Sequence, residues 1–485
     1  MSTQLTPAEL AVVEVVNEFA FLNPFSAERE ATERRFIETT GGKSKGTTGE
    51  RFPGFFHWLD QLPAAKRELR GFSGHDREAM RTVFLFEGYH RYLPALDELI
   101  STQLSRGDRS SPAPFGRTCI ETMLARGFTR DEAVRYFGIF YQLRRAHHFI
   151  VHALKGRSPC MFEFRRRLWK SVFTDDVRWY ERHLWNRMED FSTLLLGETG
   201  SGKGTAASAI GRSGFIPYLP ERGEFAESFN HTFVAINLAE FPETLIEAEL
   251  FGYRKGAFTG AIGSHDGVFA RCSPHGAIFL DEVGEIRKDI QVKLLHVLQD
   301  RTFSPVGSRE QSQFRGRVIS ATNRSLDELR AEKLFRDDFY YRISSDVIPV
   351  PSLRQRVAED PGELNLLLET ILERTAGEHW PELLPTVRDQ LQKSPGRTYH
   401  WPGNVRELEQ AVRRVLLHGI YEPEPERAAR RDEFDGMMEG KLTADELLKR
   451  YCAHAVRLFG TRAAASRHLA LDVRTVQKYI GSEQN

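Results

Sequence analysis

A glycine-rich turn between a short apolar run and a helical stretch is the first place where this sequence could do chemistry. FSTLLL is followed by GETGSGKGT over residues 191–205. Glycines in such a turn let the backbone wrap around a phosphate with its N–H groups pointing inward, and the lysine neutralises the β- and γ-phosphates. The turn predicts a nucleotide-binding loop made of Gly197, Glu198, Thr199, Gly200, Ser201, Gly202, Lys203, Gly204 and Thr205. A chance glycine turn is the alternative, and the preceding strand argues against it.

One position of the loop departs from the general pattern. A serine or threonine normally follows the lysine and binds Mg²⁺, whereas this chain has Gly204 there. Thr205 stands one position late, so ligation of the metal by that hydroxyl is left open.

Paired carboxylates end a second apolar run, GAIFLDEVGEI, at 276–286. Asp281 stands at the carboxyl end of the expected strand, where Mg²⁺ on a P-loop nucleotide is normally held. Glu282 could polarise an attacking water as general base. A solvated acidic turn is the alternative, and it is weaker after an apolar strand that follows a P-loop.

Asparagines end two further runs, TFVAIN and RVISATN. Asn323 could orient water or contact the γ-phosphate, and Asn237 could hydrogen-bond Glu282 and hold it away from the water. An asparagine at a strand end is more often a turn residue, so the sequence alone leaves both alternatives open.

The elements that must position these residues begin at Phe191, where short apolar runs start to alternate with helical stretches. This alternation predicts a parallel sheet with crossover helices over 186–356. Residues 1–185 and 357–420 show apolar residues at helical spacing, and the polar, Pro-containing segment 421–441 reads as a linker before a small helical tail, 442–485. The expected fold class is multidomain α/β.

Composition sets limits on function. The 485 residues allow about two to four domains, and 67 basic residues against 67 acidic ones require that any contact with DNA be local. The four cysteines are scattered, which argues against a structural zinc site or a disulfide framework. The sequence shows no secretion signal and no long apolar run, so we expect a soluble, cytoplasmic protein with no membrane contact.

The segment RKGAFTGAIG, 254–263, places an aromatic residue among glycines and small residues. Neither a core strand nor a catalytic loop needs this composition. A mobile surface turn is the alternative, and it leaves the aromatic residue unexplained.

Six motifs stand in order over residues 191–408: GETGSGKG, ELFGYRKGAFTGA, GAIFLDEVGEI, SATNRSLDEL, LFRDDFYYRI and WPGNVREL. Together they resemble the AAA+ domain of bacterial enhancer-binding proteins, the activators of sigma-54 RNA polymerase. The resemblance implies a Rossmann-like sheet with a helical lid (357–420), ATP and Mg²⁺ as ligands, and assembly into a ring, commonly a hexamer. Residues 1–185 would then be regulatory, although they match no sensor domain.

The resemblance also implies roles for individual residues. Lys203 would be the P-loop lysine, and Asp281 (the metal ligand) and Glu282 the Walker B pair. The remaining catalytic residues would be the switch Asn237, the first-sensor Asn323 and the arginine fingers Arg336 and Arg342. Arg406 would be the second sensor on the lid and bind the nucleotide. The contact with sigma-54 would be made by Gly256, Ala257, Phe258, Thr259, Gly260 and Ala261. A surface ion pair with Asp337 or Asp338 is the alternative for the two arginine fingers.

The tail segment 460–480 has the form helix, turn, helix and resembles the Fis-type helix-turn-helix of these activators. Ala463, Ala464 and Leu469 are expected to pack on Val473 and Val476. The second helix would enter the major groove of upstream DNA sites with Arg474, Thr475, Gln477 and Lys478. An ordinary helical hairpin is the alternative.

Two other readings of the whole chain stay open at this point. One is a AAA+ machine that acts on another protein. The other is a DNA-binding regulator that senses nucleotide without hydrolysing it, and the intact Lys203, Asp281 and Glu282 weigh against that reading.

Overall fold

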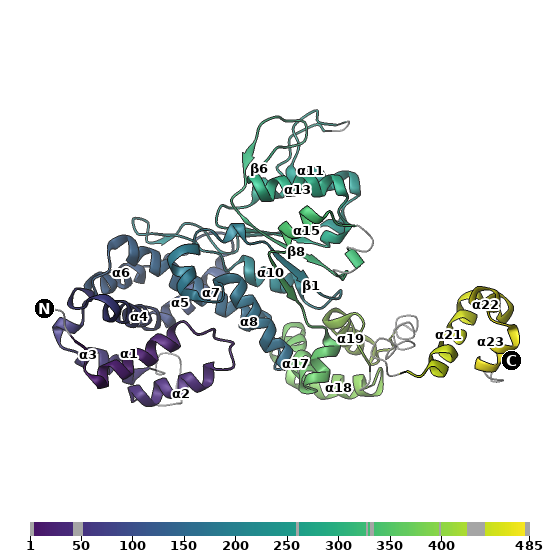
Figure 1. Cartoon of the computed structure of the whole chain (residues 1–485), viewed down its shortest axis with the longest axis horizontal. Helices are drawn as coiled ribbons and strands as arrows, with labels where there is room; N and C mark the ends of the chain where they lie inside the picture. Colours follow the sequence, from purple (N-terminus) through teal and green to yellow (C-terminus); the bar gives the residue numbers. More distant parts are fainter. Residues whose placement is uncertain are drawn as a thin grey trace. The chain divides into compact units, whose positions relative to one another are not determined.

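The computed structural model describes residues 4–41, 52–258, 261–325, 328–329, 334–396, 399–423 and 442–480 (Figure 1). The chain divides into two compact units, one of Met1–Gly377 with Gly403–Leu408 and one of Glu378–Pro402 with Glu409–Asn485. Most of the expected linker, residues 424–441, lies outside the described residues.

The N-terminal part of the first unit is helical, as the apolar spacing predicts. Capping boxes begin two of its helices, with Thr6 paired to Glu9 and Thr129 paired to Glu132, so that the first backbone N–H groups have partners. The helices are α1 (Pro7–Ala20), α2 (Arg29–Thr40), α3 (Pro53–Gln61), α4 (Gly74–Arg91), α5 (Leu93–Arg106), α6 (Phe115–Ala125), α7 (Arg130–Ala153) and α8 (Pro159–Phe173).

A five-stranded parallel sheet follows, with the order β4-β5-β8-β1-β9. The strands are β1 (Thr193–Leu196), β4 (Phe233–Asn237), β5 (Ala277–Asp281), β8 (Arg317–Thr322) and β9 (Asp346–Pro349). Each predicted apolar run supplies one strand, which confirms the predicted parallel sheet. All residues of β8 are buried, as expected for a strand covered on both faces.

The two faces of the sheet belong to two hydrophobic cores. Side chains alternate between faces along a strand, so neighbouring residues of β1 point to opposite faces of the sheet. Leu194 joins a core with α11 (Glu243–Phe251) and α13 (Lys288–Asp300). Leu195 joins a core that includes α10 (Lys203–Gly211) and continues through the N-terminal helices as far as α1 (Figure 1). The N-terminal helices and the sheet therefore share one core.

A buried arginine adds polar contacts at this junction. Arg317, at the start of β8, donates hydrogen bonds to the hydroxyls of Ser171 in α8 (3.0 Å) and Thr193 in β1 (2.8 Å). Burial lowers the pKa of Arg317 to about 10, so the group stays charged at neutral pH and needs these partners.

The first unit also contains α16 (Leu353–Glu359) and α17 (Gly362–Ala376). The helix α19 (Asn404–His418) begins in the first unit and continues in the second, which also contains α18 (Trp380–Lys393). None of the helices in the described ranges combines the length and apolar character needed to cross a membrane.

The tail consists of α21 (Ala444–Phe459), α22 (Arg462–Leu469) and α23 (Val473–Ile480). The expected packing is wrong for Ala463, which is exposed, and for Val473, which is 41% exposed. Val476 is buried as expected, together with Ala465 and Ser466. The helix α21 contacts both α22 and α23, so these two helices pack against α21 as well as against each other.

Candidate functional site

The glycine-rich turn joins β1 to α10. Gly200 has φ +78° and Gly202 has φ +105°, a backbone region that favours glycine. Gly202 is the N-cap of α10, so the first N–H groups of this helix face the loop. This arrangement suits an anionic ligand.

Lys203 is held inside the loop. Its Nζ donates to the carbonyl oxygens of Gly197 (2.9 Å) and Glu198 (3.3 Å), and it lies 4.0 Å from Glu282 Oε1. Burial lowers the pKa of Lys203, while the Glu282 and Asp281 carboxylates act in the opposite direction. The amine is therefore anchored where it can exchange backbone carbonyls for phosphate oxygens.

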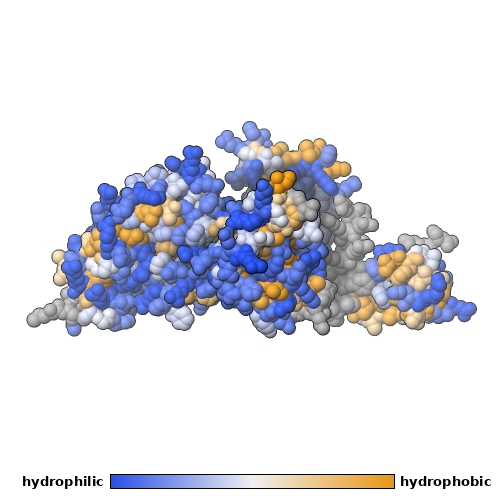
Figure 2. Space-filling model, turned by 90° about the horizontal axis from the view of Figure 1, so that it is seen from above, coloured by the Kyte–Doolittle hydropathy of each residue, from blue (hydrophilic) through white to orange (hydrophobic). Residues whose placement is uncertain are grey.

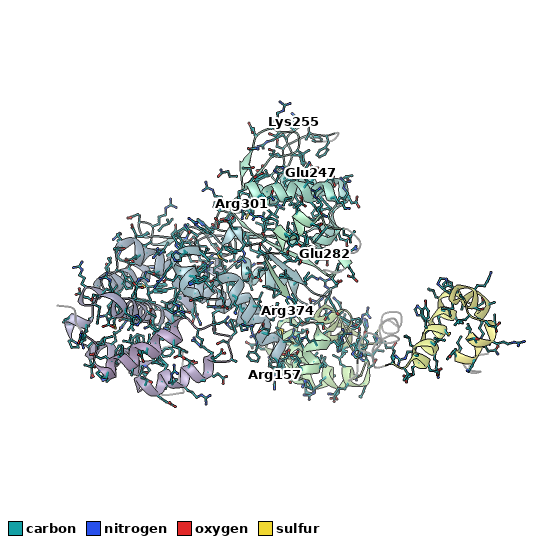
Figure 3. All side chains as sticks on the ribbon, in the orientation of Figure 1. Arg157, Glu247, Lys255, Glu282, Arg301 and Arg374 are labelled. Atoms are coloured by element: carbon teal, nitrogen blue, oxygen red, sulfur yellow. The ribbon has the colours of Figure 1, made fainter. Side chains whose placement is uncertain are left out.

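The two carboxylates lie at the carboxyl end of β5, and Figure 3 shows Glu282 at this edge of the sheet. Glu282 has φ 54° and ψ 46°, a left-handed conformation that costs energy in a residue with a side chain and is typical of functional sites. Its N–H donates to Asp281 Oδ1 at 3.0 Å. Burial raises the pKa of Glu282, with Asp281 adding to the effect and Lys203 opposing it. A raised pKa makes the carboxylate a better proton acceptor.

The two asparagines lie at the ends of β4 and β8, the strands on either side of β5, and they have different partners. Asn323 Nδ2 donates to Thr199 Oγ1 at 3.1 Å, which ties the end of β8 to the phosphate loop. Asn237 lies opposite Asp281 in the strand register, and its Nδ2 donates to Glu240 Oε1 at 3.0 Å. The hydrogen bond expected between Asn237 and Glu282 is not among the contacts of the described residues.

A residue that the sequence analysis missed, Asn404, links the loop to the start of α19. Its buried side chain donates to Thr199 O (3.1 Å) and Glu198 Oε2 (3.0 Å) and accepts from the N–H of Leu353 (2.7 Å). Asn404 follows Pro402 and Gly403 at the start of α19, but this local pattern does not show which distant segments its side chain binds. Asn404 brings the segment that contains Arg406 against the phosphate loop.

The two expected arginine fingers lie in and beside α15 (Asp337–Ile343). Arg336 forms an ion pair with Asp338 (2.8 Å), the alternative that the sequence left open, and Arg342 Nε donates to Leu298 O (3.0 Å). Across the described ranges, neither side chain hydrogen-bonds to the phosphate loop.

The described residues of the GAFTGA segment, 256–258 and 261, lie in the connection between α11 and α12 (Val268–Arg271). Phe258 is 42% exposed and packs edge-on against Tyr253, with ring centroids 4.9 Å apart. Thr259 and Gly260 lie outside the described residues, whereas Ala261 is buried. Lys255, two residues before Ala257, lies far from Glu282 in Figure 3, so the loop is remote from the carboxylates.

A family model described as the sigma-54 interaction domain matches residues 180–349. The nitrogen fixation protein VnfA of Azotobacter vinelandii is 36% identical over 303 residues, which are 60% of this chain and 54% of VnfA. The DNA-binding transcriptional regulator NtrC of Azospirillum brasilense is 36% identical over 264 residues, 54% of this chain and 47% of NtrC. An uncharacterized protein in the HyuA 5' region of Pseudomonas sp. (strain NS671) is 36% identical over 230 residues, 47% of this chain and 71% of that protein.

The chain is a bacterial enhancer-binding protein of the sigma-54 activator family. The match spans about half the length of VnfA (54%) and of NtrC (47%). The family model begins at residue 180, so the N-terminal helices of the chain lie largely outside it.

Gly204 stands where the general P-loop pattern has a serine or threonine. The structure has room for a side chain at this position, so the glycine removes a hydroxyl group without relieving a steric clash. Gly204 is exposed on the first turn of α10, and a Cβ there would meet only Phe279 Cε1, at 3.8 Å. The next residue, Thr205, is also exposed. The oxygen ligands at hand, the Asp281 carboxylate above all, fit the ligand preference of Mg²⁺.

The tail of the chain exposes most of the residues expected to contact DNA. Arg474, Gln477 and Lys478 are exposed on α23, and Thr475 is half-buried. Ala470 takes the left-handed conformation (φ 53°) at the end of α22, the place where a glycine is usual. The turn therefore has the usual backbone conformation without the usual residue.

Proposed function

We propose that this activator hydrolyses ATP in a ring of identical chains and uses the energy to remodel the closed complex of sigma-54 RNA polymerase, so that the promoter opens. The observation that carries the proposal is the convergence of four polar side chains where strands of one sheet end. They are Lys203 at the phosphate loop, Asp281 and Glu282 after β5, and Asn323 after β8.

Each group then has a chemical task. Lys203 and the N–H groups of the loop bind the phosphates, and Asp281 would hold Mg²⁺, which when bound neutralises charge on the β- and γ-phosphates. Glu282 takes a proton from the attacking water. Asn323 orients that water or contacts the γ-phosphate, and Asn237 acts as the switch once it leaves Glu240.

Assembly makes hydrolysis depend on a neighbour. Arg336 and Arg342 act in the active site of the adjacent chain, where a guanidinium stabilises charge on the phosphoryl group in the transition state. This requires Arg336 to leave Asp338, an exposed pair worth little in water. Arg406 contacts the nucleotide within its own chain, and we expect the ring to be a hexamer.

Two surfaces contact the partners of the ring, sigma-54 and DNA. The loop from Gly256 to Ala261 contacts sigma-54 with Phe258 and Thr259, and the change at the γ-phosphate moves it. The tail, 442–485, binds double-stranded DNA upstream of the promoter through Arg474, Thr475, Gln477 and Lys478, so that the ring is held near its target.

The substitution Glu282→Gln tests the hydrolytic step. The variant should bind a fluorescent ATP analogue as tightly as wild type and lose turnover by about 10²–10⁴-fold, the usual contribution of a general base. The matched control is Glu285→Gln, because Glu285 lies nearby but pairs with Arg324. Absence of turnover in wild type at every protein concentration would overturn the proposal.

The substitution Thr259→Ala tests the output loop. Hydrolysis should be unchanged, while binding to sigma-54 in the presence of a transition-state analogue should be lost. Equal binding by both proteins would point to a different protein target. Deletion of 442–485 should remove specific DNA binding and leave hydrolysis intact.

A further inference from the structure

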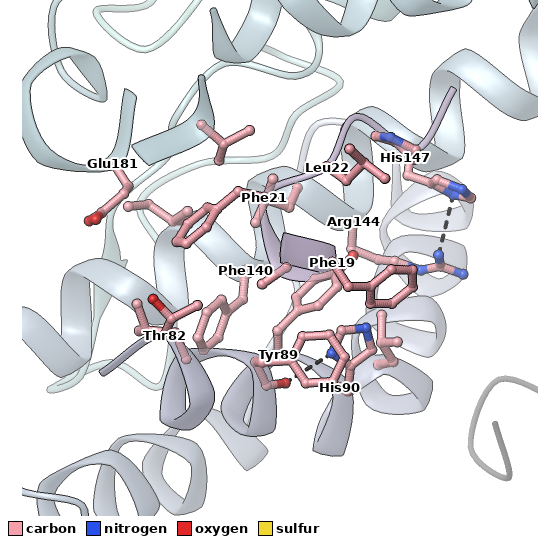
Figure 4. A pocket seen from close by; sticks show the side chains of 18 of the residues that line it. Phe19, Phe21, Leu22, Thr82, Tyr89, His90, Phe140, Arg144, His147 and Glu181 are labelled. Atoms are coloured by element: carbon pink, nitrogen blue, oxygen red, sulfur yellow. Dashed lines mark hydrogen bonds between the residues drawn. The ribbon is translucent and has the colours of Figure 1, made fainter. Parts of the chain in front are cut away.

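The N-terminal helices line a partly open cavity of about 410 Å³ that no proposed step uses (Figure 4). It lies among the ends and inner faces of α1, α4, α7 and α8. The volume falls in the range of pockets that bind small molecules, and it is well above the roughly 150 Å³ at which an apolar cavity already binds benzene. The outer surface over these helices is mostly hydrophilic, with scattered hydrophobic patches (Figure 2).

Aromatic rings dominate the wall: Phe19, Phe52, Phe86, Tyr89, Phe140 and Trp169. Aromatic rings interact favourably with one another edge-on or offset, beyond the area that they bury. Trp169 also has a buried indole N–H with no hydrogen-bond partner among the described residues. Both features favour a ligand that contains an aromatic ring and a hydrogen-bond acceptor.

The charged groups at the cavity select the charge of the ligand. Arg144 pairs with Asp97 and also donates to His147 Nδ1 at 3.3 Å (Figure 4). Burial, then Arg144 and Arg29, lower the pKa of His147 to about 4. The same burial and the same guanidinium groups would disfavour a cationic group on a ligand.

Two acidic residues, Glu33 and Glu181, also line the cavity, beside Arg29 and Arg144. The Oε2 atom of Glu181 accepts from the hydroxyl of Tyr136, and Arg81 lies 3.4 Å from its Oε1. The Glu181 carboxylate is therefore already balanced by groups of the protein. We propose that the cavity binds a small aromatic molecule that is uncharged or anionic, and that α7 transmits its occupancy to the phosphate-loop helix α10.

The route through α7 rests on its two faces. Phe140, Leu143, Arg144 and His147 line the cavity. The opposite face binds the chain just after α10, the helix that begins at Lys203. Gln142 Nε2 donates to Ser213 O (2.8 Å), and Arg145 donates to Arg212 O (2.9 Å) and Gly214 O (2.7 Å).

The side chains that make those contacts are buried. Arg145 is fully buried, and the hydroxyl of Tyr180 donates to Gln142 Oε1 at 2.7 Å. Tyr180 directly precedes Glu181, which lines the cavity. A shift of α7 by a bound ligand therefore moves groups that hold the end of α10.

Three naphthalene probes of different charge test the ligand class on the full-length protein: 2-naphthol, 2-naphthoate and 2-naphthylmethylammonium. Isothermal titration calorimetry should give saturable binding of the first two and at least about tenfold weaker binding of the cation, a difference of ~1.4 kcal/mol. Equal affinity for all three, or no saturable binding of 2-naphthol, would overturn the proposed site.

A matched pair of substitutions in α1 tests the location. Ala20 lines the cavity, whereas Ala8 is exposed near the start of the same helix. Ala20→Leu should weaken 2-naphthol binding by about tenfold or more because the added side chain takes up cavity volume. Ala8→Leu should leave it unchanged, and equal binding by the two variants would place the probe elsewhere.

The coupling to α10 rests on the proposed nucleotide site but not on hydrolysis. Because coupling between two sites is reciprocal, saturating ADP should change the Kd of 2-naphthol by about fivefold or more. In Gln142→Leu, 2-naphthol should still bind and this shift should shrink. A Kd that does not respond to ADP in wild type would overturn the coupling, whereas a failure of hydrolysis alone would leave both the site and the coupling standing.

Discussion

Gly200 should be the least replaceable glycine of the phosphate loop. A Cβ at Gly200 would lie 2.3 Å from the carbonyl oxygen of Gly403 and 2.9 Å from Cβ of Arg406. Its φ of +78° adds a conformational cost of about 1–2 kcal/mol for alanine. Gly200→Ala therefore forces the segment 403–408 to withdraw from the loop.

The cost of withdrawal follows from the contacts that are lost. Val405 N–H donates to Gly200 O at 3.1 Å, and Asn404 Nδ2 donates to Thr199 O at 3.1 Å and to Glu198 Oε2 at 3.0 Å. At about 1 kcal/mol for each bond to a carbonyl oxygen and about 2 kcal/mol for the bond to the carboxylate, their loss costs ~4 kcal/mol. Arg406 then leaves the loop, and the loss of one charge-assisted bond of about 1.5–3 kcal/mol should weaken ATP binding by roughly 10- to 100-fold.

Gly204→Ala is the matched control, because its Cβ would meet only Phe279 at 3.8 Å. Alanine is favoured over glycine in a helix by about 1 kcal/mol, so this variant should be at least as stable as wild type. Fluorescence anisotropy with an ATP analogue gives the affinity, and hydrogen exchange of 403–408 reports the withdrawal. If the two variants show the same affinity and the same exchange, the steric reasoning is refuted.

Three further predictions follow from single contacts. The raised pKa of Glu282 keeps its carboxyl group neutral to higher pH, so turnover should fall as the pH decreases, with a midpoint above pH 4.5. A pH–rate profile whose acidic midpoint lies at or below pH 4.5 would contradict this. Arg336→Ala should bind nucleotide normally but lose the increase in turnover with protein concentration, whereas Asp338→Ala should keep this increase. Equal activity of the two variants would refute the role of Arg336 in the active site of the adjacent chain. Arg474→Ala and Lys478→Ala should each lower the slope of log K against log salt for DNA binding by about 1, and an unchanged slope would remove that side chain from the phosphate contacts.

The sheet could be predicted because its strands are short apolar runs that end in polar residues. A parallel strand buried on both faces has this pattern whatever its partners are. The position of Asp281 and Glu282 at the end of β5 followed directly. Their environment did not, since the raised pKa of Glu282 depends on burial and on the distance to Lys203.

What the sequence did not reveal depends on contacts between distant segments. Asn404 binds Glu198 and Thr199, about two hundred positions away, and no local pattern encodes such a pairing. The packing of the tail was predicted only in part, because the prediction considered α22 and α23 alone, whereas α21 contacts both of them. The aromatic residues of the cavity come from several helices, so no single motif marks it.

The core that runs from α1 to the sheet has a consequence for how this protein can evolve. Recombination that exchanged the first 185 residues would cut through one hydrophobic core and would remove Ser171 from the buried Arg317. Such a hybrid would expose apolar surface on the sheet and leave a buried charge short of a partner. A new N-terminal region could therefore not be added by simple exchange, and core residues on the two sides of residue 185 should covary among related sequences.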